Sequence, residues 1–379
     1  MSKQHIPALL ARPDVNPASS KRNIRMKNQL FSVAVCLFLS AASPAQTLRF
    51  SLKDLGTFGG TSAVALSVNS TGQVVGDYTI NGKTNCFYWS AGTFGTLLWT
   101  SPYPTGSCVA SAINDGGTIA GTSTLTSGLS SAFRAIPQSW RHQVVITYLT
   151  GPYGWGTYGL GINADADVIG TSNGVYGKVA AVFKGDGTYS ELDGACAASN
   201  GTAIGGNVPF LACPFTYNGS PMQNGYGEVN GIYYNLQMLS GPPHQFAQAN
   251  ASDPATLREV GSSKDLNGFS HAVQWDFDPA GFFRVTDLMA LQNSWATGLS
   301  HDNWIIGQFI GGTHPFVIYP NAHCPTPVDL NSLLDSSGTG WTLLTANAIN
   351  NNHQIVGSGS INGVTHAVLL TSNGGLLCI

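Results

Sequence analysis

Charged side chains are scarce in this sequence, and the motifs of the common enzyme classes are missing. Asp, Glu, Lys and Arg make up only 9% of the 379 residues, and glutamate occurs three times, at Glu191, Glu228 and Glu259. There is no H-E-x-x-H and no phosphate-binding loop of the G-x-x-x-x-G-K-[ST] type. We therefore expect a protein that is not an enzyme and needs no cofactor. Two aspartates on separate loops could still hydrolyse a glycosidic bond, so a secreted polysaccharide hydrolase stays an alternative.

Positive charge is concentrated at the N-terminus. Six of the 16 Lys and Arg residues, but only one of the 19 acidic residues, lie in the first 27 positions. The rest of the chain therefore has 10 basic and 18 acidic residues, a net charge of −8. Such an acidic chain without a basic cluster is a poor partner for nucleic acid or for an anionic membrane. The charge balance leaves neutral glycans or proteins as the expected partners.

The N-terminal segment has the pattern of an export signal. Residues 1–25 are polar and featureless, and we expect them to be disordered or to precede the true translation start. Residues 26–45 combine basic Lys27, an apolar run over 30–39 and small residues that favour cleavage after Ala45. The run is too short to span a membrane. We predict a secreted or extracellular protein, with the periplasm as the alternative compartment and no membrane association after cleavage.

Cysteine usage agrees with export. Removal of Cys36 with the signal leaves an even number, namely Cys86, Cys108, Cys196, Cys213, Cys324 and Cys378. Six cysteines in an exported chain indicate disulfides, with 15 possible pairings. We expect sequence neighbours to pair, as Cys86–Cys108, Cys196–Cys213 and Cys324–Cys378. No CxxC and no His/Cys pair at ligand spacing occurs, so we expect no metal site.

One pattern of residues recurs along the chain. In the four clear copies an Asn stands seven positions before a Gly, at Asn69, Asn114, Asn163 and Asn350. The residues two and four positions before each Asn are small: Ser67 and Ala65, Ala112 and Ala110, Gly161 and Gly159, Ala348 and Ala346. Self-similarity of this kind is the signature of a repeat architecture.

Each copy predicts a β-hairpin. A short alternating strand leads into the Asn, and a β-branched pair before the Gly forms the next strand. Asn at the first turn position and Gly at the fourth, as in residues 69–72 and 114–117, are typical of a type I turn in which the Asn side chain bonds the backbone just ahead. Small residues suit the innermost strands of a propeller, which converge near its axis. The repeated Gly indicates a bulge or a close backbone approach.

Three weaker copies extend the series to seven. Ser300 replaces the Asn in one copy, the Asn is lost in residues 194–205, and the turn is enlarged around Asp253 in the third. The seven glycines are Gly76, Gly121, Gly170, Gly205, Gly261, Gly307 and Gly357. Their average spacing of about 47 residues is the length of a four-stranded propeller blade with its loops.

A third and a fourth strand are predicted after each hairpin. Residues 50–57 have the fourth-strand pattern without three strands before them, as closure of a ring by the N-terminus requires. We predict that residues 46–379 form a single all-β domain, a β-propeller of seven four-stranded blades. Six or eight blades are the alternatives, because the spacing on either side of Gly205 is irregular.

Further motifs accompany the hairpins, at Asp54-Leu55-Gly56-Thr57-Phe58-Gly59-Gly60, His271-Ala272-Val273-Gln274-Trp275 and His366-Ala367-Val368. With the Asn–Gly copies, they make residues 50–379 resemble the HAF-repeat family of bacterial extracellular proteins. The resemblance implies a secreted repeat protein without an assigned reaction. His271, His314 and His366 share one register, and we expect them to have a structural role at strand ends, such as bonding a neighbouring blade.

Aromatic residues gather in the connections between units. The candidate ligand-binding residues are Trp99, Tyr103, Tyr153, Trp155, Tyr158, Trp295 and Trp341. In a propeller these connections share one face around the mouth of the channel, where exposed rings stack on sugars or peptides. The alternative is that the rings pack on one another at the blade ends. We predict a monomeric binding module for a neutral glycan or a cell-surface protein, with a purely structural repeat protein as the alternative.

Overall fold

The computed structural model describes residues 47–375, except for 92–94, 100–105, 125–126, 139–140, 153, 155, 175–176, 193–199, 206–207, 218–219, 230–231, 254, 291, 312–313 and 320–326. The predictions for residues 1–25 and for the signal at 26–45 therefore lie outside the described residues. In the described part of the chain, no helix is long and apolar enough to cross a membrane.

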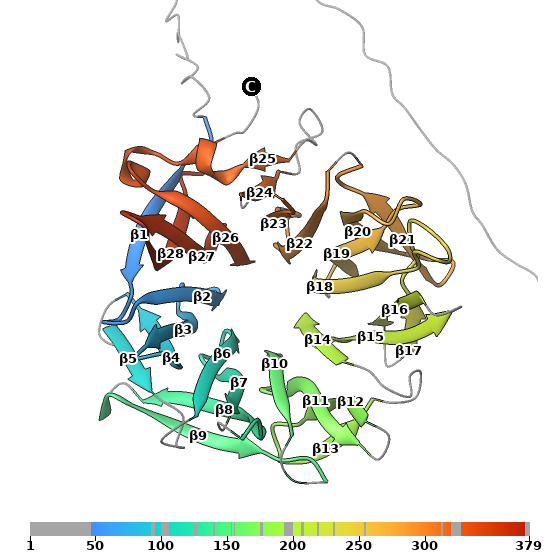
Figure 1. Ribbon diagram of the computed structural model, residues 1–379, viewed down its shortest axis with the longest axis horizontal. Helices are drawn as coiled ribbons and strands as arrows, with labels where there is room; N and C mark the ends of the chain where they lie inside the picture. Colours follow the sequence, from blue (N-terminus) through green and yellow to red (C-terminus); the bar gives the residue numbers. More distant parts are fainter. Residues whose placement is uncertain are drawn as a thin grey trace, which may run out of the picture. The chain divides into compact units, whose positions relative to one another are not determined.

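Antiparallel strands make up almost all of the regular structure and are arranged as blades around a central axis (Figure 1). The described strands form five four-stranded sheets and one eight-stranded sheet. The eight-stranded sheet consists of two blades joined by the single parallel pair Ser62–Thr365. The all-β propeller is therefore confirmed, with seven four-stranded blades among the described strands.

The first four blades follow the chain in order, each with its first strand innermost. Blade 1 comprises β2 (Ser62–Val68), β3 (Val74–Ile80), β4 (Lys83–Ser90) and β5 (Gly95–Trp99). Blade 2 comprises β6 (Ser107–Ile113), β7 (Ile119–Thr124), β8 (Ser130–Gln138) and β9 (Gln143–Leu149). Blade 3 comprises β10 (Tyr158–Ile162), β11 (Val168–Gly174), β12 (Gly177–Phe183) and β13 (Tyr189–Glu191). Blade 4 comprises β14 (Asn200–Gly205), β15 (Val208–Tyr217), β16 (Ser220–Val229) and β17 (Ile232–Asn235).

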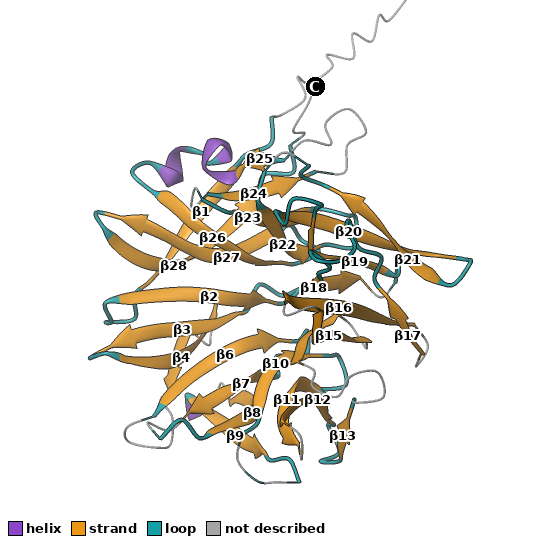
Figure 2. Ribbon diagram, turned by 45° about the vertical axis from the view of Figure 1, so that its right-hand side comes forward, coloured by secondary structure: helices purple, strands orange, loops and turns teal. Residues whose placement is uncertain are grey.

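The last three blades complete the ring. Blade 5 comprises β18 (Ala247–Asp253), β19 (Arg258–Lys264), β20 (Ser270–Asp278) and β21 (Phe282–Asp287). Blade 6 comprises β22 (Ser294–Leu299), β23 (Ile305–Phe309), β24 (Pro315–Ile318) and β25 (Val328–Asp329). Blade 7 comprises β26 (Thr342–Ile349), β27 (Gln354–Ile361), β28 (Val364–Ser372) and the N-terminal β1 (Phe50–Gly56). Two short 3-10 helices, η3 (Leu330–Leu333) and η4 (Ser336–Gly338), precede β26, and Figure 2 shows how strongly strands dominate the rest.

The N-terminal strand closes the ring, as the orphan fourth-strand pattern predicted. β1 pairs antiparallel with β28, from Phe50 opposite Ser372 to Asp54 opposite Val368. Nδ1 of His366 on β28 lies 2.9 Å from a carboxylate oxygen of Asp54 on β1. The two ends of the propeller are therefore held together by both backbone and side-chain hydrogen bonds.

The repeated glycine faces a β-bulge on the innermost strand. In blades 1, 2, 3, 5, 6 and 7 the strand register slips by one residue, and the bulged residues are Leu66, Ser111, Leu160, Asn250, Thr297 and Asn347. A Cβ on Gly76 would lie only 2.1 Å from the carbonyl oxygen of Val64 and 2.9 Å from the ring of Phe87. The glycine is thus required by close approach of backbone and of a third-strand aromatic ring, which confirms its predicted packing role.

The hydrophobic core is divided into clusters between neighbouring blades. One cluster packs Val356, Ala367 and Leu369 of blade 7 against residues of blade 1, including Val74 and Phe87. Further clusters join blades 1 and 2, blades 2 and 3, and blades 5 and 6. Because each cluster takes side chains from two blades, burial of these apolar surfaces stabilises the ring rather than single blades.

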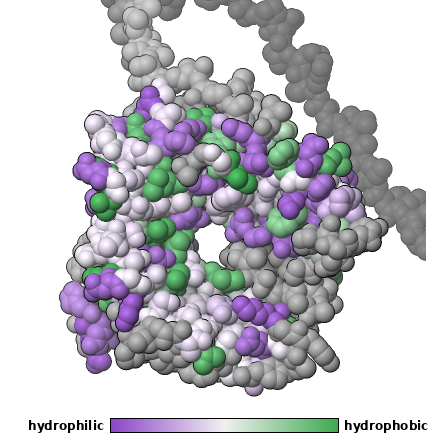
Figure 3. All heavy atoms as spheres, viewed as in Figure 1, coloured by the Kyte–Doolittle hydropathy of each residue, from purple (hydrophilic) through white to green (hydrophobic). Residues whose placement is uncertain are grey.

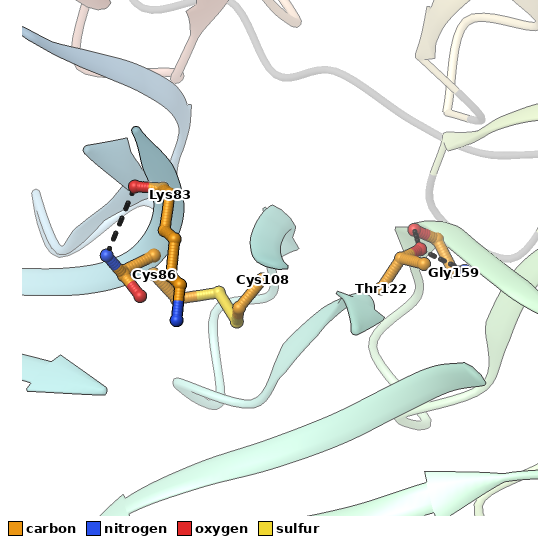
Figure 4. Close-up of a disulfide and its surroundings, with 6 residues drawn as sticks. Lys83, Cys86, Cys108, Thr122 and Gly159 are labelled. Carbon is orange, nitrogen blue, oxygen red and sulfur yellow. Dashed lines mark hydrogen bonds between the residues drawn. A yellow bond between two sulfur atoms is a disulfide. The ribbon is translucent and has the colours of Figure 1, made fainter. Parts of the chain in front are cut away.

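A disulfide fastens blade 1 to blade 2. Cys86 on β4 and Cys108 on β6 are bonded, with their Cα atoms 5.4 Å apart, and both are fully buried in the cluster between these blades (Figure 4). This predicted pairing is confirmed. The Cys196–Cys213 and Cys324–Cys378 predictions involve residues 196, 324 and 378, which lie outside the described residues.

Blade 4 departs from the sequence prediction. Residues 202–205 were expected to form a second strand, but they belong to β14, the innermost strand, whose partner β15 follows it. The loss of the Asn from this copy removes the turn signal that places the hairpin in the other blades. In blade 5 the prediction is correct: Asp253 ends the first strand and Arg258 begins the second.

Candidate functional site

The ring has two faces of different construction. We call the end that carries the turns between first and second strands the turn face. The opposite end, with the connections between blades and between second and third strands, is the loop face. Because consecutive strands are antiparallel, every blade presents the same kind of connection on the same face.

On the turn face the repeated asparagines link one blade to the next. Each Oδ1 accepts from the backbone amide four residues ahead, as in Gln73 N to Asn69 Oδ1 at 2.9 Å. Three of the four Nδ2 groups reach the following blade: Asn350 donates to Asn69 O at 2.8 Å, Asn69 to Asn114 O at 3.0 Å, and Asn114 to Asn163 O at 2.8 Å. Nδ2 of Asn163 donates to Asp167 of its own blade, at 3.2 Å. The predicted Asx turn is confirmed, and the same side chain also forms an inter-blade bond that the sequence did not reveal.

Further polar contacts between blades lie around these asparagine hydrogen bonds. Asp115 accepts from Ser70 N at 2.8 Å, and Asn351 accepts from His301 N at 2.9 Å. His301 Nδ1 lies 2.9 Å from Asp253, and His353 Nε2 lies 2.7 Å from Asp302. Each of these bonds crosses between neighbouring blades. These charged and amide groups of the turn face hold neighbouring blades together.

The axial channel between the faces has small, mostly uncharged walls. A cavity of about 440 Å³ lies at the turn-face mouth, and one of about 240 Å³ lies deeper, with Ser252, Leu299 and Ile349 lining both. The opening at the centre of the ring is visible in Figure 3. Along its wall the bulged residues of three blades bond to the next blade: Asn250 to Ala296 O, Thr297 to Ala346 O and Asn347 to Ala65 O.

On the loop face each repeated histidine pairs with the aspartate of its own blade's outermost strand. Nδ1 of His271 lies 2.8 Å from Asp287, that of His314 lies 3.4 Å from Asp329, and that of His366 lies 2.9 Å from Asp54. The expectation that these histidines bond a neighbouring blade was wrong, because strand pairing places the third-strand His beside the fourth-strand Asp. The prediction that these histidines have a structural role at the ends of strands was correct.

A pocket of about 300 Å³ opens on the loop face between blades 5 and 6. It is lined by the β19–β20 turn, by His271, and by the β21–β22 connection: Asp265, Asn267, Phe269, His271, Ala290, Gln292 and Asn293. The side chain of His271 is only 5% exposed. Nε2 of its ring lies 4.0 Å from a carboxylate oxygen of Asp265. His271 was predicted to be structural, and no pattern in the sequence indicated this pocket.

The predicted aromatic residues differ in their surroundings. Tyr103, Tyr153 and Trp155 lie outside the described residues. Trp99 and Trp341 are half-buried and pack against core clusters, Trp341 with its ring centroid 5.4 Å from that of His366.

Tyr158 and Trp295 share one register on the innermost strands, five positions before Asn163 and Ser300. Lys178 Nζ lies 4.2 Å from the ring centroid of Tyr158, and Trp295 is 37% exposed. Of the predicted aromatic positions that the structure describes, these two therefore remain candidates for ligand contact.

The described residues contain no group of three or more His, Cys, Asp or Glu side chains that could hold a metal ion. The buried carboxyl group of Glu259 lies between blades 4 and 5 and lines none of the cavities described. Burial raises the pKa of Glu259 well above its ordinary value, and its Oε2 has no hydrogen-bond partner in the described part of the chain.

Comparison with known proteins supports the fold alone. No protein-family model matches the chain, and no curated protein matches its sequence. The β-propeller domain of the Trilobed protease from Pyrococcus furiosus, described as having an open velcro topology, is 8% identical with a TM-score of 0.51, over 83% of this chain and 96% of that chain.

Two further solved structures resemble the chain more weakly. TolB from Acinetobacter baumannii is 11% identical with a TM-score of 0.40, over 63% of this chain and 62% of that chain. A gluconolactonase from Xanthomonas campestris is 8% identical with a TM-score of 0.39, over 87% of this chain and 99% of that chain. Membership in the HAF-repeat family stays a prediction from the motifs.

Proposed function

We propose that the protein is a secreted, non-catalytic binding propeller that holds a neutral glycan on its loop face. The observation that carries this proposal is the unequal use of polar groups on the two faces. On the turn face three of the repeated asparagines, Asp115, and the His301–Asp253 pair are engaged between blades. The loop face keeps an exposed ring, Trp295, and a polar pocket with free hydrogen-bonding groups.

The charge of the chain supports a neutral ligand. Between residues 46 and 379 the acidic residues outnumber the basic ones, 18 to 10, so a polyanionic polymer would be repelled. Sugar rings have apolar faces that stack on aromatic side chains, and stacking on one ring contributes roughly 1 kcal/mol. A rigid scaffold with variable connecting loops is a common arrangement for binding proteins.

A glycan array, run beside a hydrolysis screen on the same polysaccharides, tests the proposal. We expect binding of a neutral glycan without turnover, and about fivefold weaker binding by Trp295→Ala. Phe282→Ala is the matched control, because Phe282 is also 37% exposed but lies on β21, the outermost strand of blade 5. Equal affinity of both variants and the wild type would remove Trp295 from the binding surface.

Hydrolysis in the screen would contradict the non-catalytic part of the proposal. Asp115 and Asp253 both line the turn-face mouth, where a pair of carboxylates could act on a glycosidic bond. Turnover that disappears in Asp115→Asn would therefore establish the hydrolase alternative. If the protein bound cell-surface proteins and no glycan, the ligand in this proposal would be a protein and not a glycan.

A further inference from the structure

The pocket between blades 5 and 6 differs from its counterpart in blade 7, although both contain the same His–Asp pair. In blade 7 the ring of Trp341 packs edge-on against His366, and the β27–β28 turn consists of only Asn362 and Gly363. In blade 5 a longer turn, residues 265–269, rises opposite His271 and leaves a cavity beside its ring. The shared motif is structural, so the cavity is a feature of blade 5 itself.

His271 presents a free nitrogen to this cavity. Its Nδ1 is bonded to Asp287 at 2.8 Å, and an ionised carboxylate only accepts, so this nitrogen carries the hydrogen. Nε2 is then an acceptor in the neutral ring and a donor in the protonated ring, and a hydroxyl group can bond to it in either form. Among the described residues Nε2 has no hydrogen-bond partner, and Asp265 lies 4.0 Å away. The ring of His271 is therefore fixed by Asp287 and has one nitrogen available to a group in the cavity.

The β19–β20 turn is shaped by Asp265. Its Oδ1 accepts from the amides of Asn267 and Phe269, at 2.9 and 2.8 Å. Desolvation would raise the pKa of Asp265, but the backbone bond from Phe269 and both bonds from Asn267, together with nearby His271, lower it below its ordinary value. Asp265 is therefore a fixed acceptor for hydroxyl groups. The same bonds hold Phe269 at the rim, where its side chain is 53% exposed.

The opposite wall supplies hydrogen-bond donors. Oδ1 of Asn293 accepts from Ser270 N at 2.9 Å. Its Nδ2 has no hydrogen-bond acceptor among the described residues and can donate to a ligand. Gln292 is exposed, and its side-chain amide has no hydrogen-bond partner among the described residues. Acceptors on one wall and amide donors on the other match hydroxyl groups, which both donate and accept.

We propose that this pocket binds a single neutral sugar residue, with Phe269 against the apolar face of the ring. Asp265 accepts from its hydroxyls, Nε2 of His271 bonds to one of them, and Gln292 and Asn293 donate to them. A volume of about 300 Å³ is at the lower end of the range for small-molecule sites. This inference rests on the proposed glycan-binding function and assigns it a specific place.

Saturation-transfer NMR and calorimetry with glucose, galactose, mannose and N-acetylglucosamine test the pocket. We expect at least one of these sugars to bind the full-length wild type. Phe269→Ala and Gln292→Ala should each weaken that binding about tenfold. Leu266→Ala is the matched control, because Leu266 is 78% exposed in the same turn but does not line the pocket. Asp265→Asn keeps the turn-forming Oδ1 and should still fold, with weaker binding.

The outcomes separate the pocket from the wider function. A glycan that binds on the array with the same affinity to wild type, Phe269→Ala and Gln292→Ala overturns the pocket and leaves the loop-face function standing. Binding of no glycan and no monosaccharide overturns both. Equal weakening by Leu266→Ala would show a general effect of the turn and would also overturn the assignment.

Discussion

Glu259 occupies a position that Val or Ile fills in other blades. The equivalent residues, two before the repeated glycine, are Val74, Ile119, Val168, Ile305 and Ile355, all fully buried. Glu259 is buried as well, at 2% exposure, and its carboxyl lies where a side chain on Gly227 of blade 4 would otherwise stand. A buried carboxyl without a compensating charge favours its neutral form, which explains the raised pKa of Glu259.

The buried carboxyl predicts a pH-dependent stability. The folded protein holds the Glu259 proton above the pH at which the unfolded chain releases it. The free energy of unfolding is therefore highest below the pKa of Glu259 in the unfolded chain, about 4.3. It falls as the pH rises, by about 1.4 kcal/mol per pH unit, until the pKa of Glu259 in the folded protein is reached. Glu259→Gln should flatten this fall and raise the melting temperature above that of the wild type near pH 8. Melting curves from pH 4.5 to 8 measure it.

Two comparisons make the pH prediction specific. Burial raises the pKa of Asp77 to about 6, so a residual fall in stability between pH 4 and 6 should persist in Glu259→Gln. Glu191→Gln is the control, since Glu191 is only half-buried and accepts from the hydroxyl of Tyr189. Parallel pH curves for Glu259→Gln and the wild type would show that Glu259 is ionised in the folded protein.

At the scale of the strand, the repeated glycine and the bulge opposite it form one unit. A Cβ on Gly121 would lie 2.1 Å from Val109 O and 2.5 Å from the ring of Phe133. Gly121→Ala should therefore lower the free energy of unfolding by roughly 3 kcal/mol, as overpacking of a rigid core does. Gly116→Ala, in the turn of the same blade, is the control: its nearest atom would be Asn114 Oδ1 at 3.3 Å. Urea unfolding of both variants measures the difference, and equal stabilities would refute the packing role.

The disulfide between β4 and β6 supplies a second prediction at this scale. The bond closes a loop with a sequence separation of 22, so its removal should cost roughly 3 kcal/mol through the entropy of the unfolded chain. The double variant Cys86→Ala with Cys108→Ala should melt at a lower temperature than the wild type. Peptide mapping without reduction tests the bond itself. Recovery of peptides with free thiols at Cys86 and Cys108 would contradict it.

For the whole molecule, the sequence was sufficient where the structural signals are local. The Asn turn, the glycine and the β-branched pair repeat in adjacent residues, so the hairpins and the number of units could be predicted. The Asp54 strand at residues 50–57 predicted ring closure because its pattern matched other fourth strands. Residues 202–205 of blade 4 were assigned to the wrong strand, because this copy lacks the Asn that marks the turn between the first and second strands.

The candidate site was less accessible to prediction. The inter-blade bond of Asn69 and the His271–Asp287 pair join residues whose proximity depends on the completed ring or blade. The pocket beside His271 depends on the turn of residues 265–269, which occurs in a single copy and so produces no repeat signal. Trp99 and Trp341 were assigned to ligand contact by their position in loops, although burial turns out to engage both in packing.

The central claim is that ligand binds on the loop face, and a crystal structure of the protein with a glycan selected from the array tests it most directly. We expect a sugar residue between blades 5 and 6, in contact with Phe269, with Trp295 available to further residues of the glycan. A glycan located instead in the turn-face mouth, beside Asp115 and Asp253, would contradict the account.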